Sequence, residues 1–165
     1  MDRLTQPLHD EHRELFPHVE RILEVAGLIG QAPTADVRGG LEEAYDFLAH
    51  HLLAHARAEE AALYPAVQAA LGSPAATRTM SRDHVEIEGY IQELAALKDG
   101  LGEAKLGQSE AVALRRVLYG LHALLKLHFA KEEEVYLPIL DGYLTPDTAR
   151  EMFEAMERTA ASASR

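Results

Sequence analysis

Residues 55–65 read HARAEEAALYP, and residues 128–138 read HFAKEEEVYLP. In both stretches a glutamate follows the histidine by four positions, a second glutamate follows it by five, and a proline follows it by ten. A further histidine lies upstream at nearly the same distance, because His12 precedes His55 by 43 positions and His84 precedes His128 by 44. Self-similarity of this kind is typical of a repeated structural unit. We therefore expect two helical hairpins that each carry a histidine and then a HisxxxGlu pair.

The segments around these motifs have the apolar spacing of helices, and no segment alternates as a half-buried strand does. Clusters of glycine and proline separate the apolar segments from one another. We predict four long helices and a shorter fifth, at about residues 7–28, 36–71, 76–98, 109–140 and 146–160. Short connections between long helices favour an antiparallel up-down four-helix bundle, so the predicted fold class is all-α. We expect the bundle to occupy residues 1–145, and a short C-terminal helix and tail to occupy residues 146–165.

The composition excludes several classes of protein. The chain has 165 residues, with 16 Lys and Arg against 27 Asp and Glu, and a net charge of −11. A nucleic-acid or anionic-membrane partner needs a basic face, so neither is expected. The absence of cysteine excludes disulfides, zinc–thiolate sites and iron–sulfur clusters. No apolar run reaches the ~20 residues of a membrane span, and the N-terminus lacks the apolar stretch of a secretory signal, so we expect a cytoplasmic protein.

The repeated polar residues lie on apolar helix faces. A glutamate four positions after a histidine lies one turn along the same face, so each HisxxxGlu pair can converge on one point. The neighbours at helical offsets are mostly Leu, Ile and Val, which places these polar groups towards the core. A buried carboxylate must be paired, protonated or bound to a metal. Imidazole nitrogens together with carboxylate oxygens suit iron or manganese, and zinc is chemically possible. The predicted metal ligands are His12, His55, Glu59, His84, His128 and Glu132.

This arrangement of histidines and glutamates resembles that of the hemerythrin-like, or HHE cation-binding, family over about residues 8–140. The resemblance implies a four-helix bundle around two iron ions held without haem, rather than manganese or zinc. It also implies an oxo, hydroxo or water bridge between the ions. The resemblance implies that His12 and His55 bind one iron and that His84 and His128 bind the other. It also implies that Glu59 and Glu132 bridge the two ions.

One position departs from the family pattern. Oxygen-carrying members have a second histidine four positions after the first on the third helix, and this chain has Glu88 there. One iron should therefore have a more open coordination, which argues against a pure reversible oxygen carrier. We expect Glu88 on the buried face, as an iron ligand or as a hydrogen-bond acceptor for a ligand histidine, against the alternative of a partly exposed glutamate on a seam of the bundle.

Other polar residues near the motifs have less defined roles. His51 lies one turn before the histidine of the first HisxxxGlu pair and is a candidate extra ligand, hydrogen-bonding group or proton relay, against a packed or half-exposed histidine. Tyr136 either brings its hydroxyl near the second bridging carboxylate or belongs to the ordinary core. Only the first glutamate of each run shares the face of the histidine, so Glu60, Glu133 and Glu134 are expected in solvent or in salt bridges.

Three functions remain open at this point. The first is an iron protein that binds or reacts with oxygen, peroxide or nitric oxide in oxidative or nitrosative stress or in iron handling; as an enzyme it would be a di-iron oxidoreductase acting on peroxide or oxygen. The second is a non-enzymatic sensor or carrier of oxygen, redox state or iron. The third is a purely structural bundle with histidines in its core. The expected partner is a small diatomic molecule or peroxide, and the oligomeric state is left open.

Overall fold

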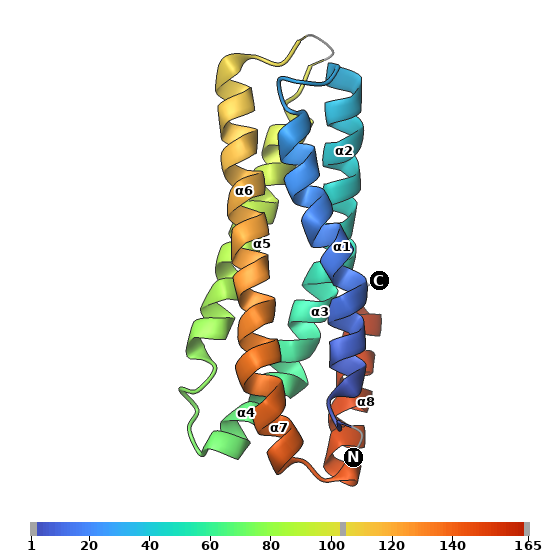
Figure 1. Cartoon of the computed structure of the whole chain (residues 1–165), viewed down its shortest axis with the longest axis vertical. Helices are drawn as coiled ribbons and strands as arrows, with labels where there is room; N and C mark the ends of the chain where they lie inside the picture. Colours follow the sequence, from blue (N-terminus) through green and yellow to red (C-terminus); the bar gives the residue numbers. More distant parts are fainter. Residues whose placement is uncertain (1–2, 103–104, 164–165) are drawn as a thin grey trace.

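The computed structural model describes residues 3–102 and 105–163, and every regular element in these ranges is helical. Four antiparallel rods form an elongated bundle, and a fifth helix lies against one end of it (Figure 1). The first rod is α1 (Gln6–Leu28) and the third is α5 (Arg78–Asp99). The predicted all-α four-helix bundle with a short C-terminal helix is therefore confirmed.

The second and fourth rods are continuous but change their hydrogen-bonding pattern along their length. The second rod consists of α2 (Thr34–Asp46), the π-helical η1 (Phe47–Leu52), α3 (Leu53–Ala58), the π-helical η2 (Glu59–Leu63) and α4 (Tyr64–Leu71). The fourth rod consists of α6 (Gln108–Lys131), the π-helical η3 (Glu132–Tyr136) and α7 (Leu137–Tyr143). The rods begin and end within about three residues of the predicted helices.

The repeated proline accounts for two of these π-helical turns. A proline inside a helix has no N–H to donate, and its ring clashes with the carbonyl four residues earlier. The residue before Pro65, Tyr64, donates its N–H to the carbonyl of Glu59, five residues back. In the same way the residue before Pro138 donates to the carbonyl of Glu132. Each repeated glutamate therefore begins a widened turn, and π-helical turns are frequent at functional sites.

A polar layer separates two apolar clusters along the axis of the bundle. One cluster is built mainly from the residues of α1, α2, α5 and α6 that lie towards the loop within each hairpin, including Ile22, Leu41 and Leu118. The other lies towards the opposite end, around Leu63 and Leu137. In each rod the repeated histidines and glutamates fall between residues of the first cluster and residues of the second. This sequence pattern places the polar side chains in one buried layer.

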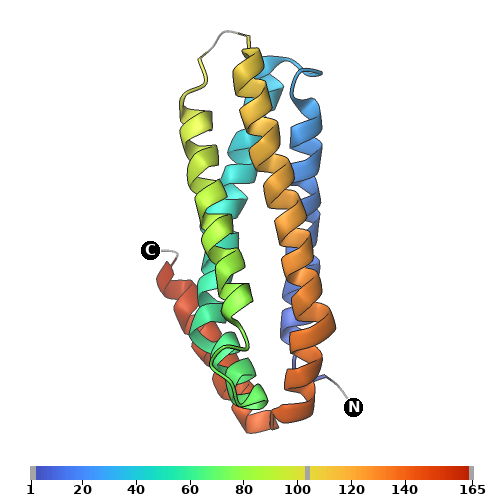
Figure 2. The ribbon, with the colours of Figure 1, turned by 90° about the vertical axis from the view of Figure 1, so that its left-hand side faces the viewer.

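The C-terminal helix α8 (Pro146–Ala163) turns back along α3 and η2 (Figures 1 and 2). Its buried residues are Ala149, Met152 and Met156, and the two methionines belong to the second apolar cluster. From the sequence, the fifth helix could either lie across the bundle or fray into solvent. The packing of α8 excludes fraying. The domain boundary expected at residue 145 stays a prediction.

No helix within the described residues combines the length and the apolar character that a membrane crossing requires.

Candidate metal centre

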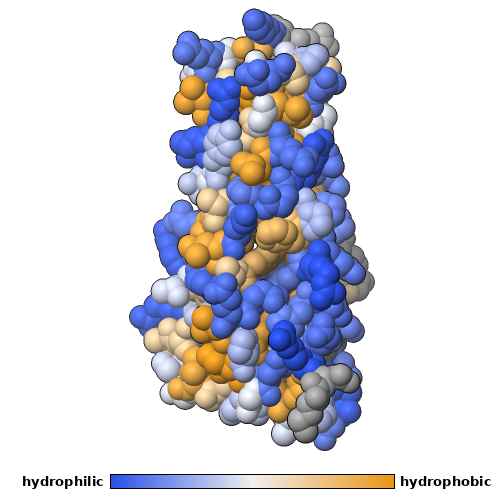
Figure 3. Space-filling view, in the orientation of Figure 1, coloured by the Kyte–Doolittle hydropathy of each residue, from blue (hydrophilic) through white to orange (hydrophobic). Residues whose placement is uncertain are grey.

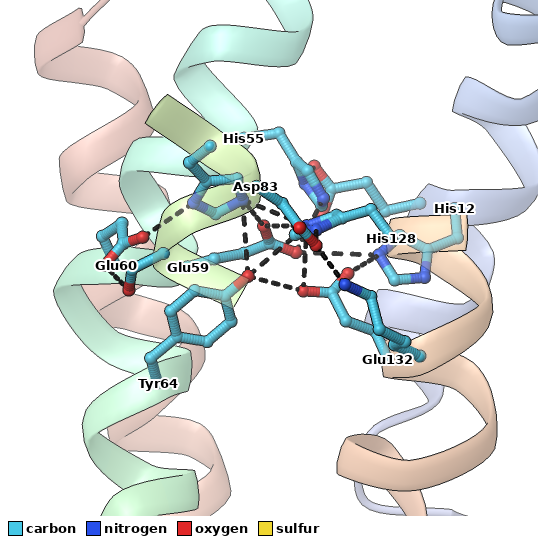
Figure 4. A network of polar contacts seen from close by, with 12 residues as sticks. His12, His55, Glu59, Glu60, Tyr64, Asp83, His128 and Glu132 are labelled. Carbon is cyan, nitrogen blue, oxygen red and sulfur yellow. Dashed lines mark hydrogen bonds and ion pairs between the residues drawn. The ribbon is translucent and has the colours of Figure 1, made fainter. Parts of the chain in front are cut away.

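All six residues predicted as metal ligands meet in the polar layer (Figure 4). They come from all four rods, so the site depends on the closure of the whole bundle. Both glutamates are completely buried, and only the imidazole of His84 keeps partial access to solvent. The six residues are His12 on α1, His55 on α3, Glu59 on η2, His84 on α5, His128 on α6 and Glu132 on η3.

Glu59 lies between the two pairs of histidines. Its Oε1 atom is 2.9 Å from Nε2 of His55 and 3.8 Å from Nε2 of His12. Its Oε2 atom is 3.2 Å from Nε2 of His84 and 3.9 Å from Nε2 of His128. One oxygen therefore faces each pair, which is the geometry of a carboxylate that can bridge two cations.

Glu132 repeats this arrangement from the opposite side of the layer. Its Oε2 atom is 3.4 Å from Nε2 of His12, and its Oε1 atom is 3.4 Å from Nε2 of His128. The two carboxylates thus divide their oxygens between the same two histidine pairs. The duplicated sequence has produced a duplicated set of donors related by an approximate twofold arrangement.

The inward-facing atoms fit metal ions because they have no other partner. Five of them are buried and form no hydrogen bond: Nε2 of His12 and His55, both oxygens of Glu59, and Oε2 of Glu132. A buried polar atom that is left unpaired costs about 1–3 kcal/mol, and more where it is charged. The donor atoms form two groups that are each small enough to surround one ion: His12, His55, Glu59 and Glu132; and Glu59, His84 and His128. Imidazole nitrogen and carboxylate oxygen suit iron and manganese, and zinc in smaller coordination numbers.

An outer carboxylate contacts the second ring nitrogen of each of the four histidines. A carboxylate accepts and does not donate, so in the neutral form of each histidine Nδ1 carries the proton and the Nε2 lone pair faces inwards. The four Nδ1–oxygen contacts are His12 to Glu133 at 2.7 Å, His55 to Glu11 at 2.9 Å, His84 to Glu60 at 2.8 Å and His128 to Asp83 at 3.0 Å. All four imidazoles are therefore held in the tautomer that a metal ion needs.

These outer contacts follow the sequence repeat. Glu11 and Asp83 each precede the first histidine of a hairpin and hold the second histidine of the same hairpin. Glu60 and Glu133 each follow a bridging glutamate and hold the first histidine of the other hairpin. Two of the outer contacts thus join the two rods of one hairpin, and the other two join one hairpin to the other.

Two of the extra glutamates form ion pairs, as expected, but with partners that the sequence did not identify. Glu60 is exposed and Glu133 is half-buried, and they contact the imidazoles of His84 and His12. Glu134 is exposed, as expected. The sequence carried a signal for this arrangement, since in both hairpins an acidic residue precedes the first histidine and another follows the glutamate of the HisxxxGlu pair.

Tyr64 is a member of the site that sequence reasoning missed. Its hydroxyl donates to Oε1 of Glu132 at 2.9 Å, and lies 3.3 Å from Nε2 of His84 and 3.4 Å from Nε2 of His128. In a π-helical turn, residues five apart lie nearly above one another, which brings Tyr64 to the face of Glu59. The corresponding signal was the proline that follows it. Tyr136 instead donates to the carbonyl of Ala76 at 3.1 Å.

Burial and charge set the protonation of the site. Burial raises the pKa of the Tyr64 phenol, and the charges of Glu59 and Glu132 raise it further, so the phenol stays protonated. Burial opposes the protonation of His128, but contacts with Glu132 and Glu59 outweigh it and raise the pKa of the imidazole to about 10. The pKa of His55 is likewise raised well above its usual value, against its burial, by Glu59 and Glu11.

The pKa of Glu59 shows the opposite shift. Burial opposes its ionisation, but the charge of His55 and contacts with the other imidazoles lower its pKa well below the usual value. The carboxylates and imidazoles of the layer thus stabilise each other's charged forms. Metal ions and protons therefore compete for the same imidazole nitrogens.

Two candidate residues do not join the donors. The expectation that Glu88 lies on the buried face is wrong, because its side chain is exposed. The next buried residue after His84 on α5 is Ile87, and this three-residue step leaves Glu88 on the flank of the helix. His51 is also exposed, and its ring stacks on Phe47 at 6.5 Å between centroids. The π-helical η1 that contains it shifts its register relative to the following α3.

The fold and the donor set define a class of protein: a four-helix bundle that encloses a metal-binding core of histidines and glutamates. A family model, the hemerythrin HHE cation-binding domain, matches residues 3–140, and the chain belongs to this family. The resemblance noted from the sequence is thereby confirmed, and the protein contains a metal-binding domain. No curated protein and no solved structure matches the chain.

Proposed function

We propose that the polar layer holds two iron ions and that this centre binds or reacts with a small oxidant, namely oxygen, peroxide or nitric oxide. In this proposal one ion lies with His12 and His55, and the other lies with His84 and His128. The observation that supports it most directly is the position of Glu59, whose two oxygens divide between the histidine pairs and have no hydrogen-bond partner. Iron bound here would supply electrons to the oxidant or take them back.

The remaining residues define how the site would treat a small ligand. The second donor group has one donor fewer than the first, and Tyr64 lies beside it with a protonated hydroxyl. The phenol has a single proton, so Tyr64 can donate to an oxygen-containing ligand at this position in place of Oε1 of Glu132. The exposed side chain of Glu88 does not fill the position, which supports an open site for exogenous ligands.

Burial supports chemistry that must be protected from bulk water. Phe129 stacks on the ring of His12 at 4.7 Å between centroids, and Tyr64 stacks on the ring of His84 at 5.4 Å. An aromatic ring therefore covers one histidine of each pair. Water exclusion strengthens electrostatic interactions within the site, which suits a centre that changes its redox state. A role in oxidative stress or iron handling fits this chemistry and belongs to the same proposal.

The test is metal analysis of protein purified from iron-replete cells, together with its optical spectrum before and after hydrogen peroxide. We expect two irons per chain in the wild type and a spectrum that peroxide changes. Glu59→Gln should lose at least one iron, whereas Glu134→Gln, a matched change at an exposed glutamate of η3, should lose none. Less than one equivalent of iron or manganese in the wild type would support the structural-bundle alternative instead.

Rapid mixing of the reduced protein with oxygen or peroxide distinguishes an enzyme that consumes the oxidant from a protein that binds oxygen reversibly. Consumption of repeated additions of peroxide, with a reductant present, would support enzymatic turnover. An oxygen adduct that releases oxygen under vacuum would support a carrier or sensor. A reduced protein that responds to neither oxidant would contradict the proposal while leaving metal binding intact.

A further inference from the structure

A cleft between α1 and α6 lies beside the metal centre without belonging to it. Its volume is about 670 Å³, and its lining includes His12, one of the proposed ligands. Pockets that bind small organic molecules usually measure roughly 300–1,000 Å³. A diatomic oxidant or a peroxide needs only a small part of this volume. Figure 3 views the face of α1 and α6, where apolar side chains are bordered by strongly hydrophilic ones.

Two phenylalanines form the apolar part of the cleft. Phe16 on α1 is 38% exposed, and Phe129 on α6 is buried. Phe129 stacks on the imidazole of His12, which also lines the cleft. A molecule in the cleft would therefore lie beside a proposed metal ligand.

Three cations line the cleft, namely Arg3, Arg13 and Lys126, although the chain as a whole has a net charge of −11. Arg13 pairs with Asp10 at 2.9 Å, and Lys126 pairs with Glu20 at 3.4 Å while its ammonium lies 5.7 Å from the centre of the Phe16 ring. Exposed ion pairs of this kind contribute about 0–1 kcal/mol, so an anionic ligand can compete with both acids.

His9 provides an independent sign of a polar ligand group. It is a buried histidine of the lining, and its Nε2 atom has no hydrogen-bond partner. Its Nδ1 atom contacts Glu133, the one acidic residue among the described residues of the lining. Both oxygens of Glu133 are occupied, one by His9 and the other by His12. The acid is therefore engaged by imidazoles, while Nε2 of His9 is buried without a partner.

We propose that this cleft binds a small organic acid. Its apolar body would lie on Phe16 and Phe129, its carboxylate would pair with Arg13 and Lys126, and a further polar group would bind Nε2 of His9. The proposal goes beyond the function proposed above, because neither iron nor an oxidant takes part in the binding.

The test uses the protein with its metal and 4-fluorobenzoate as probe, followed by ligand-observed fluorine NMR. The neutral analogue 4-fluorobenzyl alcohol has the same ring without the carboxylate. The key variant is the double change Arg13→Gln and Lys126→Gln. Arg150→Gln is the matched control, because Arg150 on α8 is also exposed and also pairs at 2.9 Å with an aspartate three residues earlier.

We expect saturable binding of the acid, with the alcohol and the double variant each weaker by about tenfold, which corresponds to about 1.4 kcal/mol. Arg150→Gln should bind the acid as the wild type does, and Phe16→Ala should weaken the acid and the alcohol together. Equal affinity for acid and alcohol, unchanged affinity in the double variant, or no saturable binding would each overturn the proposal. Iron content measured on the same samples tests the metal centre separately, since acid binding without iron would contradict only the function proposed above.

Discussion

Glu11 contacts Nδ1 of His55 at 2.9 Å, although the two residues are 44 positions apart and belong to different rods of the bundle. Nε2 of the same imidazole lies 2.9 Å from Oε1 of Glu59. One side of the ring is thus fixed by an outer carboxylate, and the other side faces the cation site. The same relation recurs at Asp83 and His128, so it is a property of the repeat.

Glu11→Gln tests the contribution of an outer carboxylate. The amide can still accept a hydrogen bond from His55, but it removes the negative charge that makes the imidazole a stronger ligand. We expect metal affinity to fall by roughly 10–100-fold, as measured by competition with a chelator. Glu14→Gln, at an exposed position one turn away on α1, is the control and should bind metal as the wild type does. Equal affinity of the two variants would assign Glu11 no role at the site.

Tyr64→Phe removes one hydroxyl and keeps the ring that stacks on His84. Because Oε1 of Glu132 loses its donor, we expect the free energy of unfolding to fall by about 0.5–1.5 kcal/mol, with the fold retained. The larger effect should be on the optical spectrum and on the rate of the reaction with peroxide. A variant with wild-type spectrum and rate would place Tyr64 in a packing role alone.

The pH dependence should have opposite signs with and without metal. The raised pKa values of His55 and His128 stabilise the chelator-treated protein fully below about pH 6.5, the pKa of free imidazole. This stabilisation should be lost as the pH rises towards the pKa of His128, about 10. In the metal-loaded protein, acid should instead release the metal below about pH 6.5, because protons take the ligand nitrogens.

Thermal unfolding of the two forms across this pH range checks the prediction. The lowered pKa of Glu59 increases the free energy of unfolding at pH values above the ordinary pKa of a glutamate. This contribution from Glu59 is lost as the pH falls below that ordinary pKa. Parallel curves for the metal-loaded and chelator-treated forms would contradict the competition between protons and metal.

Met152→Ala tests whether α8 stabilises the bundle. Met152 is buried in the apolar cluster next to η2, and truncation of a buried methionine costs about 2–5 kcal/mol. We expect a lower free energy of unfolding in a single transition, and Glu151→Ala, at an exposed neighbour, should change it little. A separate early transition in Met152→Ala would show that α8 unfolds independently of the four rods.

The repeat explains why much of the architecture was predictable. A histidine and a glutamate four apart, each surrounded by apolar neighbours, determine both the helix face and the layer in which it is buried. Two copies of the pattern therefore predicted the four rods and the six donors, because helical periodicity is a local property.

The errors arose where the helix was not regular or where a contact joined distant rods. Glu88 was predicted from a strict four-residue step, whereas packing on α5 follows a three-residue step after His84. Tyr64 was missed because a π-helical turn places it on the face of Glu59. The contact between Glu11 and His55 joins two rods, and helical periodicity within one rod does not reveal such a pairing.

The most direct test of the account is a crystal structure of the iron-loaded protein with anomalous diffraction recorded at the iron edge. We predict two anomalous peaks within the polar layer, one beside His12 and His55 and the other beside His84 and His128, with an oxygen of Glu59 bound to each. A single peak, or two peaks that Glu59 does not join, would contradict the bridging arrangement on which the proposed function rests.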